Sequence, residues 1–592
     1  MNPILKRLAA LRQAMQQQNI SATIIPGTDP HASEYIADYW KEREWISGFD
    51  GSAGTMVITL KHACLWTDSR YFIQAEAQLI GTEIQLMKQG LAETLDIPTW
   101  LKANLIFLDT VGINPQYFSY NEFQSLEKEL YKNTITLTSA DLIGSIWVDR
   151  PALPLSPFYI FKTEFTGRST SDKLVDVRIG MKKAEADVLL ISALDEIAWL
   201  FNIRSNDIAF NPVVIAYALI EKDSATLFVA PEKLSAETRS YFQTLGVNLL
   251  DYRSIHECIE NLPDTSSVWL DGTKLNYFLI DAIPQSCTIL NSKTPLTEFK
   301  SIKNETEIAG IRKAMIKDGV ALTKFFMWLE GNLASGDLTE ISIAEQLEKF
   351  RCEQENFVCE SFGSIAGYGP HGAIVHYSST PETNSTLKSE NILLLDSGGQ
   401  YLDGTTDITR TVALGKATDQ QKRDFSLVLK GHIALASAIF PEGTCGSHLD
   451  ILARKELWRE GLNYGHGTGH GVGHFLCVHE GPQSIRPDQN PTVLKTGMLL
   501  SNEPGMYRAN EYGIRIENLI QVIPYSKTEF GEFLQFETLT LFPLDRELIE
   551  IRLLTEDEKH WVNNYHQKVF EKISPMLNET EREWLEKKCK SI

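Results

Sequence analysis

The change of sequence pattern near residue 357 is the feature that most constrains the fold of this chain. Before it, short apolar runs such as "SATIIPG" and "GTMVITL" alternate with helical stretches, which is typical of α/β domains. After it, short strands alternate with tight turns, as in "NILLLDSGGQYLDGTTDITRTVAL", and a closing helical pattern begins at about residue 555. The sequence therefore predicts α/β and α+β domains in one chain.

The length of 592 residues is several times that of a typical domain. "DRPALPLSP" at residues 149–157 predicts a linker, and a second α/β pattern follows it, with a helix expected over residues 181–202. Another helix opens the third region, because Asn304 and Glu307 form a capping-box pattern ahead of apolar residues at helical spacing. We expect domains at residues 1–155, 156–298 and 299–592, the last with a C-terminal extension.

Charge and cysteine usage bound the partners and the compartment. Lys plus Arg number 56 against 77 Asp plus Glu, and this net charge of -21 argues against nucleic acid or an anionic membrane as the main partner. The eight cysteines form no CxxC pair that would indicate structural zinc or redox chemistry. The sequence shows neither an apolar run of roughly 20 residues, the length of a membrane span, nor the apolar stretch of a signal peptide. We expect a cytoplasmic protein.

Several common catalytic motifs are missing from the sequence. It contains no HExxH, no GxSxG and no GxxxxGK[ST]. The glycine row that begins at Gly465 does not match GxGxxG either, because His470 stands where the third glycine is needed. Zincin, serine hydrolase and nucleotide-binding interpretations therefore lose their main support.

Four carboxylates stand inside apolar strand patterns. Asp396 ends the run "ILLL", and Asp407 follows eleven residues later in the returning strand of a hairpin. Glu503 precedes Pro504 and is biased toward an extended conformation. In "GIRIENLIQV", strand alternation places Glu517 and Arg515 on the face opposite the isoleucines. Such carboxylates should be partly buried and need partners; the alternative for the two aspartates is a pair of turns in a surface hairpin.

The stretch "HGTGHGVGHFLCVHEG" at residues 466–481 concentrates imidazole and glycine. Glycines at alternate positions from Gly465 to Gly473 disfavour a helix by about 1 kcal/mol per residue. In an extended chain His466, His470 and His474 share one face, while the glycines let another backbone or a substrate approach closely. The alternative is a glycine-rich loop whose histidines are incidental.

The charges of this set point to metal ions. Four converging carboxylates in a partly buried site would repel one another and take up protons. Two divalent cations neutralise the four charges, and one imidazole completes five ligands, which is the arrangement of two-metal hydrolases. Oxygen ligands with a single nitrogen favour Mn(II), with Zn(II) or Co(II) as alternatives.

The ordered set Asp396, Asp407, His470, Glu503 and Glu517, with "GTGHGVG", "EPG" and "GIRIEN" around it, resembles the metallopeptidases of the pita-bread fold. Within that group, which includes methionine aminopeptidase, prolidase and aminopeptidase P, the chain is most similar to the three-domain cytosolic Xaa-Pro aminopeptidases. The similarity extends through "DPHASEYIADYW", "GFDGSAGT", "DRPALP", "GAIVHY" and "VHEGP". It implies two creatinase-like α/β domains followed by a pita-bread catalytic domain.

Carried over residue by residue, the resemblance implies a role for each ligand. Asp396 would bind one metal, and Asp407 and Glu517 would bridge both. His470 and Glu503 would complete the coordination of the other metal. Glu503 would also act as the general base toward the attacking water.

The resemblance also implies residues around the metals. His376 and His479 match active-site histidines that contact the substrate at the scissile bond. His466 and Arg515 match positions that orient ligands and bound peptide. His474 matches no catalytic role and is expected to be a packed histidine, and His371 stands where a small or uncharged residue is usual, at the expected rim of the pocket.

The activity implied is removal of the N-terminal residue from peptides with proline second. A bond to the proline nitrogen is a tertiary amide, and its hydrolysis needs a strong nucleophile and a pocket for the ring. The free amine of the substrate, held near Asp396, would fix the cut to one residue. The resemblance further implies a homodimer. The alternatives are a prolidase with the same ligands and a metal-free pita-bread binding protein.

Overall fold

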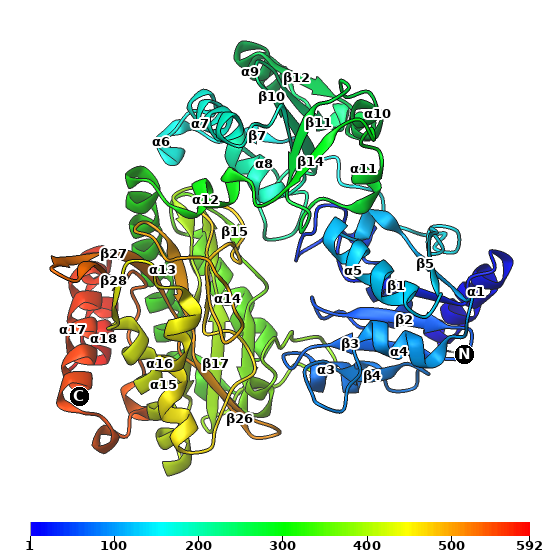
Figure 1. The fold of residues 1–592 in the computed structure, drawn as a ribbon. Coiled ribbons are helices and arrows are strands. Elements are labelled where there is room, and N and C mark those ends of the chain that lie inside the picture. The colour runs from blue at the N-terminus through cyan, green and yellow to red at the C-terminus, as the bar shows by residue number, and fades with distance from the viewer. Residues whose placement is uncertain (1) are drawn as a thin grey trace. The chain divides into compact units, whose positions relative to one another are not determined.

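The computed structural model describes residues 2–592, which form two compact units (Figure 1). Unit 1 comprises the described residues up to Lys162 together with Arg168–Leu296, and unit 2 comprises Thr163–Gly167 with Thr297–Ile592. Each unit has its own buried apolar clusters. Within residues 2–592, no helix combines the length and the apolar character that crossing a bilayer requires.

The first half of unit 1 is built on a six-stranded mixed sheet with the order β4-β3-β2-β1-β5-β6. β1 runs antiparallel to β2 and parallel to β5. Leu8, Leu11 and Met15 of the N-terminal helix pack into the core against this sheet. The strands are β1 (Ala22–Pro26), β2 (Thr55–Thr59), β3 (Ala63–Thr67), β4 (Gln85–Lys88), β5 (Thr110–Ile113) and β6 (Thr136–Ser139). The helices are α1 (Pro3–Gln17), α2 (Glu42–Ser47), α3 (Phe72–Gln78), α4 (Ile97–Asn104) and α5 (Tyr120–Tyr131).

The second half of unit 1 repeats this architecture. Its sheet has the order β12-β11-β10-β8-β13-β14, and each neighbouring pair runs in the same relative direction as its counterpart in the first sheet. The strands are β8 (Val188–Ile191), β10 (Ala216–Glu221), β11 (Ala225–Val229), β12 (Val247–Leu250), β13 (Ser267–Leu270) and β14 (Thr288–Asn291), with a separate pair β7 (Tyr159–Ile160) and β9 (Ile203–Arg204). The helices are α7 (Thr170–Lys183), α8 (Leu194–Leu200), α9 (Ala236–Leu245), α10 (Ile255–Glu260) and α11 (Tyr277–Asp281), followed by α12 (Pro295–Ser301), which leads into unit 2.

The helix expected over residues 181–202 is wrong in its middle. α7 ends at Lys183, the strand β8 takes Val188–Ile191, and α8 begins at Leu194. All four side chains of β8 are buried. The apolar run "VLLI" is therefore a central strand covered on both faces, a pattern that periodicity alone does not separate from a buried helix.

Unit 2 opens as the capping box predicts. The long helix α13 (Glu305–Asn332) follows Asn304, whose side chain accepts hydrogen bonds from the backbone N–H groups of Thr306 and Glu307. The Glu307 carboxylate accepts one from the backbone N–H of Asn304 at 2.9 Å. α13 is followed by α14 (Glu340–Cys352), and α6 (Thr163–Thr166) belongs to the same unit.

The strands of unit 2 form several small antiparallel sheets. Their orders are β16-β17-β20, β15-β18-β19 and β21-β28-β27-β24, with the pairs β22-β23 and β25-β26. The first group comprises β15 (Phe357–Glu360), β16 (Ile365–Tyr368), β17 (Ile392–Ser397), β18 (Gly399–Tyr401), β19 (Gly404–Thr405) and β20 (Ile408–Ala413). The second comprises β21 (Ile439–Pro441), β22 (Gly469–His470), β23 (Ser484–Ile485), β24 (Leu499–Asn502), β25 (Gly505–Arg508), β26 (Tyr512–Arg515), β27 (Asn518–Thr528) and β28 (Gly531–Thr538).

Helices cover these sheets. α15 (Asp419–Ala436) and α16 (Gly446–Arg459) pack against each other and interrupt the strand pattern that the sequence predicts after residue 357. The signal for α15 is a capping box between Thr418 and Gln421. The C-terminal extension folds as α17 (Glu556–Ile573) and α18 (Glu579–Lys588), which agrees with the helical pattern expected from about residue 555 (Figure 1).

Candidate metal centre

The predicted hairpin delivers two of the carboxylates to one place. Asp396 lies on β17, Asp407 directly precedes β20, and the register of these antiparallel strands sets Asp396 opposite Thr409. Glu517 joins them because its backbone N–H donates to the carbonyl of Thr409 at 3.1 Å. All three carboxylates are buried, so the alternative of a surface hairpin with two turn aspartates is wrong.

The glycine-rich segment brings His470 and Glu503 to the same place. The backbone N–H of Glu503 donates to the carbonyl of Thr468 at 2.7 Å, and that of His470 donates to Ser501 Oγ at 3.0 Å. A β-carbon on Gly469 would stand 2.1 Å from the carbonyl oxygen of Ser501. Only glycine permits this backbone approach, as the sequence pattern predicts.

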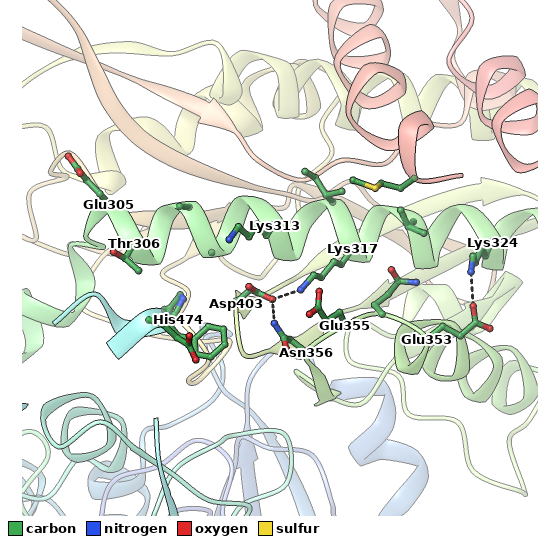
Figure 2. A pocket seen from close by; sticks show the side chains of 18 residues that line it. Glu305, Thr306, Lys313, Lys317, Lys324, Glu353, Glu355, Asn356, Asp403 and His474 are labelled. Carbon is green, nitrogen blue, oxygen red and sulfur yellow. Dashed lines mark hydrogen bonds and ion pairs between the residues drawn. The ribbon is translucent and has the colours of Figure 1, made fainter. Parts of the chain in front are cut away.

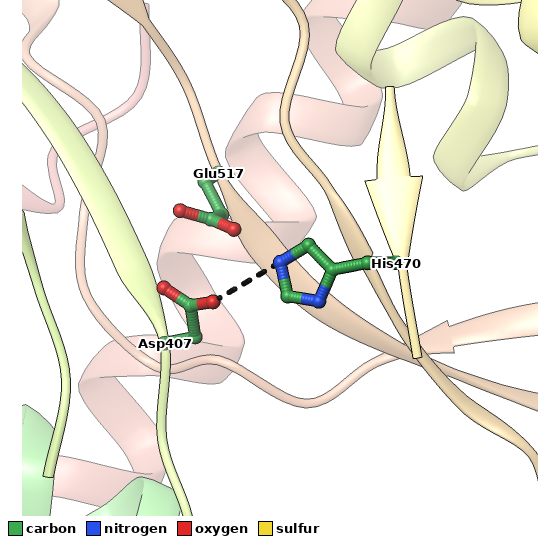
Figure 3. Close-up of side chains that lie close together, drawn as sticks. All are labelled: Asp407, His470 and Glu517. Atoms are coloured by element: carbon green, nitrogen blue, oxygen red, sulfur yellow. Dashed lines mark ion pairs between the residues drawn. The ribbon is translucent and has the colours of Figure 1, made fainter. Parts of the chain in front are cut away.

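The donor atoms converge as a metal site requires. Asp407, His470 and Glu517 each offer one atom within 4.8 Å of the others (Figure 3). His470 Nε2 lies 3.4 Å from Asp407 Oδ2 and 3.5 Å from Glu503 Oε1. His470 Nδ1 donates to the carbonyl of Gly471 at 3.0 Å, which leaves Nε2 as the ring nitrogen that faces the carboxylates.

Arg515 holds Asp396 from the other side. Arg515 Nη2 donates to Asp396 Oδ2 at 2.7 Å, and Nε donates to Thr409 Oγ1 at 3.1 Å. The Thr409 hydroxyl in turn donates to Glu517 Oε2 at 2.8 Å. Asp396 Oδ1 is buried and has no hydrogen-bond partner among residues 2–592. This carboxylate oxygen is therefore available to a cation.

The pKa values of the site residues are shifted by burial and by the neighbouring charges. Burial and the neighbouring Asp407, only partly offset by Arg515, raise the pKa of Asp396 to about 6. Burial and the charges of Asp407 and Glu503 hold the pKa of Glu517 well above its ordinary value. Burial opposes the charge of His470, but its hydrogen bond to Asp407 and the charge of Glu503 raise its pKa to about 9. Protons thus collect where cations would relieve the same repulsion.

The residue types fit divalent metal ions. Carboxylate oxygens and one imidazole nitrogen converge, one buried oxygen lacks a partner within the described chain, and Arg515 offsets only part of the summed negative charge. His470 and Glu503 keep 20% and 18% of their side chains exposed. The centre is accordingly open to solvent on the side of these two residues.

The four other predicted residues lie on the surrounding segments. His466 Nε2 lies 2.8 Å from the hydroxyl of Tyr507, to which Arg515 Nη1 donates at 2.7 Å. The His479 ring stands 4.3 Å from the His470 ring, edge to face. His376 is half-buried in the segment after the short helix Gly369–Ala373, which packs against β17, β25 and β26.

His371 and His474 contact residues other than the five candidate ligands. His371 Nδ1 is 2.8 Å from Oε1 of the fully buried Glu340, and its ring stacks on Tyr377. His474 is buried, in agreement with a packed histidine, and lines a cavity of about 1140 Å³ along α13 together with Asp403 (Figure 2). Within the described chain, the five candidate ligands take no part in lining this cavity.

Several residues that support the site escape the sequence patterns. Glu340 accepts hydrogen bonds from the backbone N–H groups of Tyr368 and Ser385 and from the Tyr377 hydroxyl, and so anchors the segment that carries His376. Next to His479, Glu480 forms ion pairs with Lys303 at 2.6 Å and Lys300 at 3.3 Å. For Thr409, the available sequence signal is strand alternation after Asp407, which places its side chain on the face opposite that of its neighbour Arg410.

Known protein families match consecutive parts of the chain. The chain matches the Creatinase/Prolidase N-terminal domain over residues 7–144 and, in a second form, over residues 149–307. Residues 309–524 match metallopeptidase family M24, and residues 532–592 match the C-terminal region of peptidase M24. The five candidate ligands lie inside the third match. These matches and the observed sheets confirm the predicted fold class.

Individual relatives share nearly the full length. A probable Xaa-Pro aminopeptidase P from Laccaria bicolor is 42% identical, covering 99% of this chain and 93% of the relative. Xaa-Pro aminopeptidase 1 from Dictyostelium discoideum is 40% identical, covering 100% and 97%.

Solved structures extend the comparison. X-prolyl aminopeptidase from Caenorhabditis elegans, a cytosolic enzyme with a di-nuclear active site, is 35% identical with a TM-score of 0.96, covering 100% of each chain. A Xaa-Pro dipeptidase from Bacillus anthracis, at 22% identity and a TM-score of 0.51 over 64% of this chain, shares the fold alone. The chain belongs to metallopeptidase family M24, in its Xaa-Pro aminopeptidase P group.

Proposed function

We propose that this protein is a metal-dependent Xaa-Pro aminopeptidase that hydrolyses the bond between an N-terminal residue and a penultimate proline. The observation that carries this proposal is the convergence of Asp407, His470 and Glu517, with Asp396 and Glu503 beside them, in a chain that aligns over its length with Xaa-Pro aminopeptidases. A binding protein that had lost catalysis would have no need to keep this unbalanced set of carboxylates.

We propose two divalent ions per subunit, held by Asp396, Asp407, His470, Glu503 and Glu517. Asp396 would bind one ion, Asp407 and Glu517 both ions, and His470 with Glu503 the other. The chemistry that two such ions supply is polarisation of the scissile carbonyl and activation of water as the nucleophile. Manganese is the first expectation for a set of oxygens with one nitrogen, with zinc or cobalt as alternatives.

The chain's own residues would move the protons and hold the substrate. Glu503 is half-buried and its Oε1 accepts from Ser501 Oγ at 3.1 Å, which leaves the other oxygen to take a proton from the attacking water as general base. His479, beside His470, and His376 would donate hydrogen bonds to the carbonyl oxygen or the leaving nitrogen. Arg515 and His466, linked through the Tyr507 hydroxyl, would keep Asp396 and the bound peptide oriented.

The substrate follows from the same arrangement. The free amine of a peptide, placed at the carboxylate of Asp396, would fix the cut after one residue. By likeness to the Xaa-Pro aminopeptidases that the chain matches, peptides with proline second are the expected partners, and nucleic acid and membranes are not. We further propose a cytoplasmic homodimer, and domains at residues 1–155, 156–298 and 299–592; the family matches that begin at residues 149 and 309 support these limits.

A peptide mixture tests the function. Purified protein with Mn(II) is incubated with Ala-Pro-Phe, Ala-Ala-Phe and Ala-Pro, before and after chelation, and the products are identified by mass spectrometry. Release of Ala from Ala-Pro-Phe but not from Ala-Ala-Phe, lost on chelation and restored by metal, is expected. Cleavage confined to Ala-Pro would make the protein a prolidase. Absence of cleavage with Mn(II), Zn(II) and Co(II) would favour a binding protein.

A further inference from the structure

Arg410 is a buried cation directly behind the candidate metal centre. It lies on β20, three residues after Asp407, and is 2% exposed. Its hydrogen-bond acceptors are all uncharged: four backbone carbonyls, one amide oxygen and one phenol. A guanidinium in a dry interior normally meets a carboxylate, because burying an unpaired charge is costly. Arg410 therefore needs another source of compensation.

One side of the guanidinium holds the strands that carry the ligands. Nη1 donates to the carbonyl of Thr409 at 3.0 Å and to the carbonyl of Glu517 at 2.7 Å. Nη2 donates to Asn518 Oδ1 at 2.8 Å. Arg410 thus clamps β20 to the start of β27, at the residue whose carboxylate enters the candidate centre.

The other side holds the C-terminal part of the chain. Nε donates to the carbonyl of Pro543 at 3.1 Å, and Nη2 donates to the carbonyl of Phe542 at 2.6 Å and to the hydroxyl of Tyr565 at 2.8 Å. Tyr565 lies on α17, and its ring stacks on that of Trp561, with the centroids 5.3 Å apart. One guanidinium therefore joins α17 to Glu517.

Three titratable groups around Arg410, which are His432, His566 and Tyr565, are neutral at pH 7. Burial and the charge of Arg410 lower the pKa of His432 to about 3 and that of His566 to about 4, so both rings are neutral at pH 7. Tyr565 is buried and has its pKa raised by burial, so it is neutral as well. The carboxylate that acts on Arg410 electrostatically is that of Glu517. The acid linked to Arg410 is therefore Glu517, whose backbone carbonyl it also holds.

We propose that Arg410 and Tyr565 are positioning residues for Glu517, through which helix α17 sets the affinity of the centre for divalent metal. The inference rests on the proposed metal-dependent function. Without the Tyr565 hydroxyl, Nη2 loses one of its three acceptors, and Asn518 Oδ1 and the carbonyl of Phe542 lose their hydrogen bonds to the same hydroxyl, so the clamp on the Glu517 backbone loosens. Removing groups that orient a ligand in this way typically weakens metal binding about 10- to 100-fold.

The test compares two tyrosines that differ in what their hydroxyls touch. Tyr565→Phe removes the hydroxyl at Arg410 and keeps the ring. Tyr401→Phe is the matched control, because Tyr401 is fully buried in the same unit but its hydroxyl donates to Asp318 at 3.0 Å. Mn²⁺ binding to the metal-free full-length proteins is measured by isothermal titration calorimetry, with thermal denaturation beside it. A Kd about 10-fold weaker is expected for Tyr565→Phe, with an unchanged Kd and a similar loss in Tm for Tyr401→Phe.

Arg410→Lys gives a second, stronger variant. It keeps the positive charge but does not reach both strands and the C-terminal carbonyls at once, so its Kd for Mn²⁺ should weaken by at least as much. Wild-type affinity in folded Tyr565→Phe would overturn the inference, as would equal weakening in Tyr401→Phe. A wild-type protein that binds no divalent metal would instead overturn the proposed function, and the inference with it.

Discussion

The two units bury charge in opposite ways. In unit 1 the buried acids Glu42 and Asp207 each have a cation of their own: Glu42 meets Arg150 at 2.9 Å, and Asp207 pairs with Lys233. In unit 2 four carboxylates converge, with Arg515 bonded to one of them. Paired buried charges are close to neutral for stability, whereas an unbalanced set costs free energy that a fold keeps only for binding or chemistry.

The two units resemble each other in how they bury apolar side chains. Unit 1 uses one strand order twice, and both of its sheets are filled by apolar side chains. Unit 2 buries comparable apolar clusters beneath its centre. The difference that marks the functional unit is therefore the balance of buried charge and not the quality of packing.

Asp407→Asn should have the largest effect, because it reduces the imbalance of buried charge in unit 2. The variant removes one charge from the unbalanced set, so Xaa-Pro cleavage should fall below detection, while the metal-free protein should gain about 1 kcal/mol in free energy of unfolding as repulsion is relieved. Mass-spectrometric peptide assays and chemical denaturation without metal measure the two effects. Substantial turnover by the pure variant would refute the proposed two-metal site.

Lys233→Met should show that unit 1 depends on pairing. It leaves the buried Asp207 carboxylate without its cation, which should lower the free energy of unfolding by about 3–5 kcal/mol. The double variant with Asp207→Asn keeps an acceptor for the Ile215 N–H and should recover most of the loss. Denaturation curves for the single and double variants decide this, and a double variant as unstable as the single one would contradict it.

Two buried groups, one in each unit, should also respond to pH in opposite directions. Burial, then Arg410 and Arg546, lowers the pKa of His566 to about 4 from 6.5, so the unfolded chain binds the extra proton between these values and the contribution of His566 is lost as pH falls through them. Burial, despite Arg150, raises the pKa of Glu42 to about 7 from 4.5, so its contribution is lost as pH rises through that window. Each effect is at most about 3 kcal/mol.

His566→Gln and Glu42→Gln isolate these two contributions. Hydrogen exchange followed by mass spectrometry at pH 5 and pH 7 reports the stability of peptides from each unit separately. His566→Gln should reduce the acid sensitivity of unit 2, and Glu42→Gln should reduce the loss in unit 1 at pH 7. Unchanged pH slopes in both variants would show that other groups govern the pH response.

Helix caps should give the smallest and most even effect. Ser169→Ala in unit 1 removes the side-chain acceptor that caps the first turn of α7. Thr555→Ala in unit 2 does the same for α17. Each should cost about 1 kcal/mol in free energy of unfolding, measured by urea denaturation. A loss from Thr555→Ala several times that from Ser169→Ala would mean that the units differ in local structure as well as in buried charge.

Much of the site could be predicted because its signals are local. Asp396 and Asp407 stand out as charges in an apolar hairpin, and the alternate glycines mark the close approach at Gly469. The capping box of Asn304 fixes the start of α13 in the same way. Such features depend on neighbours in sequence, so a single chain reveals them.

The remainder depends on contacts between distant residues. Arg410 looks like an exposed strand residue in sequence, yet its partners include Glu517 and Tyr565, which lie 107 and 155 residues away. Glu340 reads as a first-turn acid of α14, although it anchors the segment of His376. The pattern predicts helix at the strand β8 because burial on both faces removes the alternation that distinguishes a strand.

The close backbone approach in the glycine-rich segment has a consequence for inherited variation. A side chain at Gly469 would collide with the Ser501 carbonyl, and one at Gly471 would stand 2.0 Å from the carbonyl of Glu480. Neither glycine carries chemistry, yet a missense change at either position should act as a null allele, because it displaces the strand that presents His470. Genetic surveys of this gene should therefore find these two codons as depleted of substitutions as those of the ligands.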